Sequence, residues 1–475
     1  MHADSLQVKI GLETHCQLNT NTKLFCGCSI KNISKAPPNS RTCPICLGHP
    51  GSKPVVNKAA IDAGIKIALA LGCDVPEKMY FSRKIYFYPD MSKNFQITQY
   101  ELPFAKNGML EILDEAGKRK AIIIERINLE EDPAKIQHEG GSIVDAAYTL
   151  VDYNRAGTPL CEIVTAPQFS TPKEARIFLQ LLSSILEYLG VFISGELSLK
   201  TDVNISVAGG PRVEIKNVTG FWDVEKALAH ELFRQKALLE RGERIERETR
   251  AWLHETKTTV PLRKKELEED YGYIFEPDLP SLEIGKEWID KIRQQIPELP
   301  HQKFKRYISQ FKLSPELASA ITAELELALF YEQIIHEIDP RFAASWMNVL
   351  KKTLYYNKVR LKDTMLTARL FVKLLKVIQK REVSDRAGEM VLREIIFSPE
   401  KFDRLVEQYS RLEHIDDIVD KVIKQEKDAV ENYKKGDKKA IHFLIGQVIK
   451  ASGRRIDAKE AKKTIQKLIG KHGCV

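Results

Sequence analysis

The 475-residue sequence has few cysteines and no long apolar run. Eight cysteines are too few for a disulfide framework in a chain of this length. No window approaches about eighteen uninterrupted apolar residues, and the start lacks an apolar core like that of a signal peptide. We therefore expect a soluble, unexported, cytoplasmic protein that makes no membrane contact.

Two kinds of catalytic signature are also missing. No Gly-x-x-x-x-Gly-Lys-Ser/Thr or Gly-x-Gly-x-x-Gly loop occurs, so any nucleotide would bind without a phosphate-cradling helix start. Neither a Gly- and Ser-rich amidase nucleophile segment nor a convincing Cys–His pair is present. We therefore do not expect this chain to release ammonia from glutamine by itself.

Composition changes along the chain and predicts three domains. Up to about residue 295, stretches such as "QVKIGLETHCQL" and "AIIIERINLEED" alternate with the period of a strand, with a few helices between them. Helical periodicity takes over after "IPELP", and "FSPEKF" marks a second break. We predict an α+β domain at 1–295, a helical domain at 296–400 and a basic tail at 401–475.

The most specific local motif is a pair of cysteine pairs, Cys26 with Cys28 and Cys43 with Cys46. Two short-spaced pairs supply the four soft ligands of a tetrahedral zinc site. With all four positions filled by protein, such an ion would be structural and not catalytic. The alternative is a redox pair or unrelated thiols.

Acidic residues fall on the polar side of several predicted strands. By strand parity, each of four strands offers a carboxylate opposite its apolar face. The polar positions are Glu13 and His15, Asn128 and Glu130, Asp202 and Asn204, and Glu214 and Lys216. One interpretation is an ordinary solvated sheet face. The other is a Mg-ATP site, in which the carboxylates converge beside Lys216, Lys135 and Arg155.

The tail carries the excess of positive charge. From Lys421 to Val475 there are 15 Lys and Arg against 6 Asp and Glu, while the whole chain has a net charge of +8. Apolar residues at helical spacing include Phe443 and Leu444. The lysines are either a solvated helix face or a surface for the phosphate backbone of a nucleic acid. The candidate residues, which the resemblance described next assigns to tRNA binding, are Lys434, Lys435, Lys438, Lys439, Lys450, Arg454 and Arg455.

Read together, several motifs resemble one family, the GatB subunits of the aspartyl/glutamyl-tRNA amidotransferases. They are "IGLETHCQL", "YFYPDMSKNFQITQYELP", "LEEDPAK", "VDYNRAGTPLCEIVT", "DVNIS", "VEIKNV", "FEPDLP" and "AVENYKKGDKKAIHFLIGQVIKAS". The resemblance implies a glutamine-synthetase-like cradle, a helical domain and a tail domain related to YqeY proteins. It also implies ATP- and Mg²⁺-dependent phosphorylation of Glu or Asp carried by misacylated Glu-tRNA(Gln) or Asp-tRNA(Asn). Ammonia would come from a GatA-type amidase, and a small GatC-type protein would complete the complex.

The resemblance also implies roles for individual residues. The implied kinase and metal positions are Glu13, His15, Glu130, Glu131, Glu162, Asp202 and Glu214, with magnesium on Glu13, His15, Glu130 and Glu214. The implied nucleotide contacts are Lys216, Arg155, Lys135 and Asn204. The cysteine quartet resembles a zinc knuckle found in some members.

This chain departs from the family pattern at Asn128, where His is usual, at Ala134, where Gly is usual, and at Val218 to Gly220. Two other hypotheses stay open: a zinc-stabilised tRNA-docking subunit whose acidic face is only solvated, and a glutamine-synthetase-like ligase acting on a free amino acid. The sequence does not distinguish Glu-tRNA(Gln) from Asp-tRNA(Asn), nor does it give the number of magnesium ions.

Overall fold

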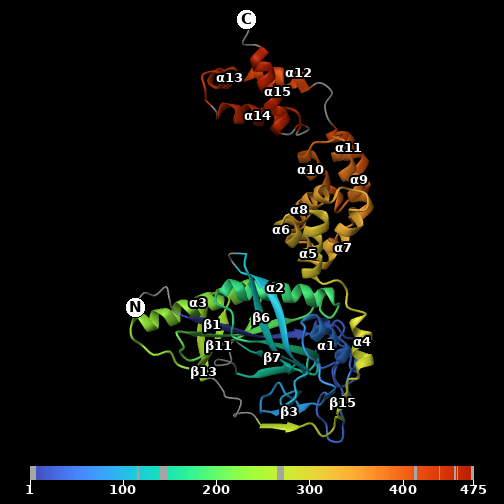
Figure 1. Cartoon of the computed structure of the whole chain (residues 1–475), viewed down its shortest axis with the longest axis vertical. Coiled ribbons are helices and arrows are strands. Elements are labelled where there is room, and N and C mark those ends of the chain that lie inside the picture. The colour runs from blue at the N-terminus through green and yellow to red at the C-terminus, as the bar shows by residue number, and fades with distance from the viewer. Residues whose placement is uncertain are drawn as a thin grey trace. The chain divides into compact units, whose positions relative to one another are not determined.

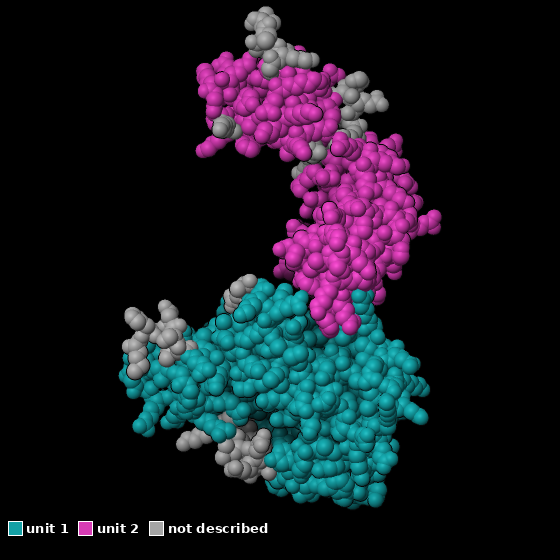
Figure 2. Space-filling view, in the orientation of Figure 1, with its two compact units in different colours: residues 1–300 teal, residues 301–475 magenta. Residues whose placement is uncertain are grey.

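The computed structural model describes residues 7–114, 117–139, 147–264, 272–410, 415–437, 439–453, 456 and 458–471. The chain divides into two compact units, residues 1–300 and 301–475 (Figure 1, Figure 2). The first unit combines sheets with helices, and the described part of the second is helical. The predicted α+β class is therefore confirmed. Among the described helices, none has the length and apolarity that a membrane span requires.

An eight-stranded sheet forms the centre of the first unit, with strand order β13-β12-β11-β10-β1-β9-β6-β5 (Figure 1). Its strands are β1 (Val8–Gln17), β5 (Ala105–Leu113), β6 (Arg119–Glu131), β9 (Pro159–Thr165), β10 (Leu199–Val207), β11 (Val213–Thr219), β12 (Glu248–Leu253) and β13 (Thr258–Lys264). Neighbouring strands run antiparallel, except that β11 and β12 are parallel. The four strands that carry the predicted acidic face all exist and lie in this one sheet.

The two faces of the sheet differ in chemistry. Leu12, Val203 and Ile215 lie on one face and are fully or almost fully buried in a single apolar cluster. Helices α2 (Pro172–Tyr188) and α3 (Phe221–Glu240) cover that face (Figure 1). Because strand side chains alternate, the intervening residues point to the opposite face, where the polar side chains gather.

Local signals explain where these two helices begin. The Thr171 hydroxyl accepts a hydrogen bond from the Glu174 amide at 3.2 Å, and Pro172 occupies the first turn of α2. Gly220 precedes α3 with a φ of 95°, a conformation that favours glycine. The departure from the family pattern at this position thus places a glycine where the backbone has a positive φ.

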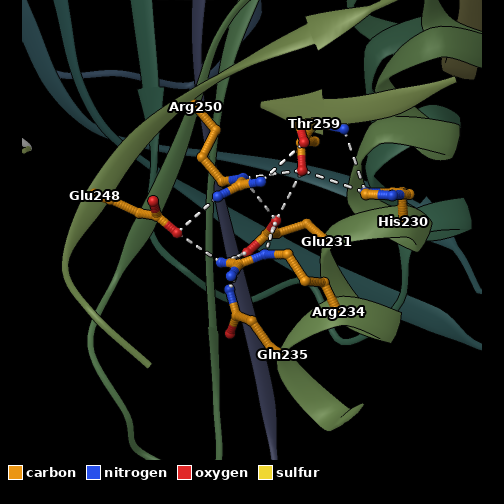
Figure 3. A network of polar contacts seen from close by, with 7 residues as sticks. All are labelled: His230, Glu231, Arg234, Gln235, Glu248, Arg250 and Thr259. Atoms are coloured by element: carbon orange, nitrogen blue, oxygen red, sulfur yellow. Dashed lines mark hydrogen bonds and ion pairs between the residues drawn. The ribbon is translucent and has the colours of Figure 1, made fainter. Parts of the chain in front are cut away.

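A network of buried charges fixes α3 to the edge of the sheet (Figure 3). Glu231 on α3 is fully buried and accepts two hydrogen bonds from Arg234. Arg250 on β12 lies 3.4 Å from Glu231 and donates to Thr259 on β13. Glu248 bonds both arginines. A buried charge of this kind is tolerated only when its hydrogen bonds are satisfied, so the network specifies how α3 packs on β12.

Smaller elements lie on the other side of the sheet and around its edges. A three-stranded sheet of order β14-β3-β4 lies on the side away from α2 and α3 (Figure 1). These elements are β2 (Lys78–Met79), β3 (Ser82–Ile85), β4 (Phe95–Thr98), β7 (Lys135–His138), β8 (Thr149–Asp152), β14 (Gly272–Phe275), β15 (Leu282–Glu283), α1 (Lys58–Ala70) and α4 (Lys286–Arg293).

The second unit contains two separate apolar clusters, one within residues 307–402 and the other within 419–469. Its helices are α5 (Pro300–Phe311), α6 (Pro315–Thr322), α7 (Leu325–Ile334), α8 (Pro340–Asn357), α9 (Ala368–Gln379), α10 (Asp385–Ile395), α11 (Phe402–Tyr409), α12 (Ile415–Gln425), α13 (Lys427–Lys434), α14 (Ala440–Ala451) and α15 (Ala458–Lys471). One apolar assignment is wrong: Phe443 on α14 is 49% exposed, because the buried stripe of this helix runs through Ile441, Leu444 and Val448.

Candidate active site

The register of the large sheet brings the predicted acidic residues together. On the central strand β1, Glu13 lies opposite Asp202 of β10, and His15 lies opposite Glu162 of β9. Further out, Glu214 of β11 pairs with a β10 residue on the same face. Directly opposed residues in antiparallel strands share a face. The pairing therefore turns separate carboxylates into one continuous acidic surface.

Glu13, Asp202 and Glu214 form the tightest carboxylate group. One oxygen from each lies within 4.8 Å of the others. Neutral side chains orient two of these carboxylates. Asn204 Nδ2 donates to Glu13 Oε1 at 2.9 Å, and Thr249 Oγ1 donates to Glu214 Oε2 at 3.0 Å. Three converging carboxylate oxygens are the hard ligands that Mg²⁺ prefers, so the residues present fit a magnesium ion.

Lys216 lies beside this group. Its Nζ is 3.7 Å from Asp202 Oδ2 and 3.9 Å from Glu214 Oε2. Its ammonium therefore offsets part of the local negative charge and lies where an anionic ligand of the same site would meet it.

His15, Glu130 and Glu162 form an adjoining group on β1, β6 and β9. His15 Nε2 lies 3.4 Å from Glu130 Oε1 and 3.7 Å from Glu162 Oε1. Burial, followed by the charge of Glu162, raises the pKa of Glu130 to about 7. Burial lowers the pKa of His15, but the surrounding carboxylates, led by Glu130, outweigh it and leave that pKa above its ordinary value. Glu130 can therefore exchange a proton near neutral pH.

Asn128 occupies the position where the resemblance predicts histidine. Its Nδ2 donates to Glu162 Oε2 at 2.8 Å, while its Oδ1 is buried and has no hydrogen-bond partner in the described part of the chain. Asparagine therefore orients Glu162.

Several of these residues line a cavity of about 820 Å³: Glu13, Asn128, Glu130, Glu162, Asn204, Glu214, Lys216 and Thr249. Asp202 and His15 are not among the described residues that line it. The opposite wall comes from β3, β4 and β14, including Lys84 and a stacked pair of tyrosines, Tyr100 and Tyr273, whose ring centroids are 4.0 Å apart. The cationic lining residues are Lys84, Arg126, Arg212, Lys216 and Arg247. A cavity lined by both carboxylates and cations suits a polyphosphate bound with a divalent ion.

Three predicted site residues lie elsewhere. Glu131 points to the opposite side of β6 from Glu130, where it pairs with the Lys93 ammonium and accepts from the Ile97 amide. The Arg155 guanidinium donates to two main-chain carbonyls, those of residues 133 and 134. Lys135 is exposed on β7. Neither Arg155 nor Lys135 is among the described residues that line the cavity, so this geometry does not support their predicted phosphate contacts.

Sequence reasoning also missed residues that line the cavity. Arg126 shares the strand parity of Asn128, so parity alone could have found it. Arg212 and Arg247 precede β11 and β12, where no local pattern marks them. Thr249 meets Glu214 only because β11 and β12 pair in parallel, which the sequence does not reveal.

The four cysteines of the predicted knuckle meet. The sulfur atoms of Cys26, Cys28, Cys43 and Cys46 all lie within 4.8 Å of one another. Sulfurs bound about 2.3 Å from a tetrahedral zinc ion lie roughly 3.8 Å apart, so the quartet fits that ion. A hydrogen bond from Cys26, together with the charge of Lys23, lowers the pKa of Cys46 to about 4, while the pKa values of Cys26 and Cys28 are raised. A thiolate is the form that binds metal.

The described candidate tRNA-binding residues of the tail are exposed. They are Lys434, Lys435, Lys439 and Lys450. Lys438, Arg454 and Arg455 lie outside the described residues. Exposure is compatible both with a solvated helix face and with a phosphate-binding surface.

Comparison with known proteins gives a consistent result. A family model described as the GatB/GatE catalytic domain matches residues 8–290, and one described as a GatB domain matches residues 329–469. The chain is 43% identical over 476 residues to the B subunit of the aspartyl/glutamyl-tRNA(Asn/Gln) amidotransferase of Saccharolobus solfataricus, covering 98% of this chain and 99% of that protein. The proteins of the same name from Natronomonas pharaonis and Carboxydothermus hydrogenoformans are each 41% identical, covering 95% and 97% of this chain and 95% and 98% of their own.

Proposed function

Because this chain belongs to the GatB family, we propose that it is the ATP-dependent subunit of an aminoacyl-tRNA amidotransferase. It phosphorylates the side-chain carboxylate of Glu-tRNA(Gln), Asp-tRNA(Asn) or both. The carboxylate oxygen attacks the terminal phosphorus of ATP and ADP leaves. Ammonia then attacks the activated carbonyl carbon and phosphate leaves, giving Gln-tRNA(Gln) or Asn-tRNA(Asn).

The observation that supports this proposal most directly is the convergence of the carboxylates of Glu13, Asp202 and Glu214, of which Glu13 and Glu214 line the cavity. These carboxylates come from three strands, and their grouping has no evident role in packing. A solvated sheet face would spread such charges apart, because like charges directly opposite destabilise a sheet. The grouping therefore favours the kinase over a purely tRNA-docking subunit.

Each part of the cavity then has a task. Glu13, Asp202 and Glu214 hold magnesium, which when bound neutralises phosphate charge. Lys216, Arg126 and Arg212, which also line the cavity, attract and orient the phosphates of ATP. The pKa of Glu130 near 7 suits a group that accepts a proton from the attacking nitrogen.

Because the sequence has no amidase motif, the reaction needs partner proteins that supply ammonia. A GatA-type amidase supplies ammonia, and a GatC-type protein completes the heterotrimer. The exposed lysines of the tail contact the tRNA backbone, whose recognition by phosphate charge needs no base-specific side chains. The reaction belongs to protein synthesis, so we place the protein in the cytoplasm.

The cysteine quartet holds a structural zinc ion, supported by its sulfur positions and its closed set of ligands. We also retain the three-domain division at about residues 295 and 400. The two apolar clusters of the second unit support a division there, although α11 packs in the first cluster, which moves the division to after Tyr409.

The test is reconstitution of the full chain with its GatA-type and GatC-type partners, ATP, magnesium, glutamine and each misacylated tRNA. We expect ADP formation that requires a misacylated tRNA, together with conversion of the attached amino acid to its amide. A free amino acid should not replace the tRNA. Amide formation without ATP consumption, or equal activity on free glutamate, would refute the proposal.

A further inference from the structure

Lys23 is a fully buried lysine next to the cysteine quartet. Its Nζ donates to Cys46 Sγ at 3.4 Å and to the Tyr153 carbonyl oxygen at 3.3 Å. Within the described residues, no carboxylate lies within 4.0 Å of this ammonium. Lysine is almost never fully buried unless an anion pairs with it, because removing its charge from water is costly.

A metal–thiolate centre would supply that anion. Four thiolates around one divalent ion carry a formal charge of −2, of which one ammonium offsets half. Without a metal, Lys23 would face at most the single charge of the Cys46 thiolate, because neutral thiols are only weak hydrogen-bond acceptors. A metal that holds all four thiolates therefore compensates the buried ammonium more fully.

The same side chain connects the knuckle to the segment formed by residues 152–155. Besides the contact from Lys23 to Tyr153, the Tyr153 amide donates to Asn39 Oδ1 at 2.7 Å, and Asn154 Nδ2 donates to the Pro37 carbonyl at 2.8 Å. Arg155 at the end of this segment donates to the carbonyls of residues 133 and 134, directly beyond β6. A continuous set of contacts thus runs from the quartet to the strand that carries Glu130.

We propose that Lys23 is the internal counter-cation of a zinc–thiolate centre at the quartet and that, through Tyr153, it makes the order of segment 152–155 depend on zinc. Lys23 is a positioning residue and touches no substrate. This inference rests on the zinc site of the proposed function. It predicts that losing the ammonium weakens zinc binding and loosens the segment, while losing a nearby exposed charge does neither.

The experiment compares the full chain with Lys23→Met and with Lys31→Met, which removes an exposed lysine from the same loop. Zinc per chain is measured by atomic emission, and zinc release is timed with a chromophoric chelator. We expect one zinc per chain in the unaltered protein, release at least about tenfold faster from Lys23→Met, and an unchanged rate from Lys31→Met. Equal release rates in all three proteins would overturn the role of Lys23.

Cobalt substitution gives a readout independent of activity. The sulfur-to-cobalt charge-transfer band should shift in Lys23→Met, because Cys46 loses a hydrogen bond from a cation, and should stay in place in Lys31→Met. An unshifted band in Lys23→Met would contradict that hydrogen bond. If Lys23→Met does not fold, Lys23→Gln carries the same expectations.

Hydrogen exchange on the unaltered chain tests the coupling without any mutation. Removing zinc with a chelator should speed amide exchange at Tyr153 and Asn154 by about tenfold or more. Unchanged exchange would refute the coupling. A chain that binds no zinc would refute the zinc site itself, whereas a zinc-loaded chain insensitive to Lys23→Met would refute only this inference.

Discussion

The first unit holds two groups of side chains that could each hold a metal ion, and they are assembled in opposite ways. The cysteine quartet spans 21 residues of one loop, from Cys26 to Cys46. The carboxylate group joins Glu13 to Glu214 across three strands of a sheet. Local spacing determines the first, and long-range strand register determines the second. We therefore expect the quartet to respond to changes in its own loop and the carboxylates to respond to anything that alters the sheet.

The largest expected effect comes from the carboxylate group. In the complete amidotransferase, Glu214→Gln should lower amide formation on the order of 10² to 10³-fold, since a magnesium ligand next to the phosphates is lost. The measurement is turnover at saturating ATP, with tRNA affinity determined in parallel. Affinity should persist.

Glu111→Gln is the matched control, because Glu111 is an exposed glutamate on β5 of the same sheet. Its turnover should match that of the unaltered enzyme. Full activity in Glu214→Gln would contradict an acidic active site and would leave the carboxylates as a solvated face of the sheet.

A smaller loss is expected from the quartet. Cys43→Ser should abolish zinc binding, lower the melting temperature and reduce amide formation by about tenfold, because the ion supports the fold and meets no substrate. Atomic emission, thermal unfolding and turnover check these points. Cys73→Ala, which alters a buried thiol outside the quartet, should keep its zinc. If Cys43→Ser abolished turnover as completely as Glu214→Gln while still folded, the quartet would have more than a structural role.

Removing a hydrogen bond that orients a proposed magnesium ligand should reduce activity less than removing the ligand itself. Thr249→Val preserves shape but removes the hydroxyl that donates to Glu214 Oε2. We expect a severalfold to about tenfold higher magnesium requirement, with turnover largely recovered at high magnesium. The control is Thr256→Val at an exposed position of the loop after β12. An unchanged magnesium requirement would show that Glu214 does not need Thr249.

The smallest effect concerns a carboxylate with cationic neighbours. Burial raises the pKa of Glu332 on α7, but hydrogen bonds from Lys303 and Arg306 outweigh it and lower the pKa below its ordinary value. The ionised carboxylate therefore stabilises the fold fully at pH values above its pKa in the unfolded chain. This stabilisation is lost as the pH falls through its pKa in the folded protein. Glu332→Gln should therefore cost about 1 kcal/mol or less at neutral pH and nothing at acidic pH, as followed by hydrogen exchange of α7. A cost that does not vary with pH would contradict the ion pairing.

The same contrast explains what the sequence could predict. Spacing alone located the quartet, and strand parity located Glu13, Asp202 and Glu214, because both depend on short-range geometry. Glu131 is next to Glu130 in sequence, yet parity sends it to the other face of β6 and into an ion pair with Lys93. The resemblance named it without regard to that alternation.

Contacts between strands that are distant in the sequence could not be predicted from the sequence. Thr249 meets Glu214 through a parallel pairing that no local pattern signals, and Arg212 and Arg247 line the cavity from positions just before their strands. The orientation of Arg155 toward main-chain carbonyls likewise depends on the loop beyond β6, which sequence reasoning could not place.

The parallel pairing of β11 with β12 has a consequence for biosynthesis. Strand β11 ends at Thr219, whereas its outer neighbour ends at Leu253, after the whole of α3. During translation the strand that carries Glu214 is therefore an open sheet edge until the ribosome has released some thirty further residues, and such edges recruit other chains. The length of the connection through α3 therefore determines how long the edge of β11 stays exposed during synthesis, when it is most prone to pair with other chains.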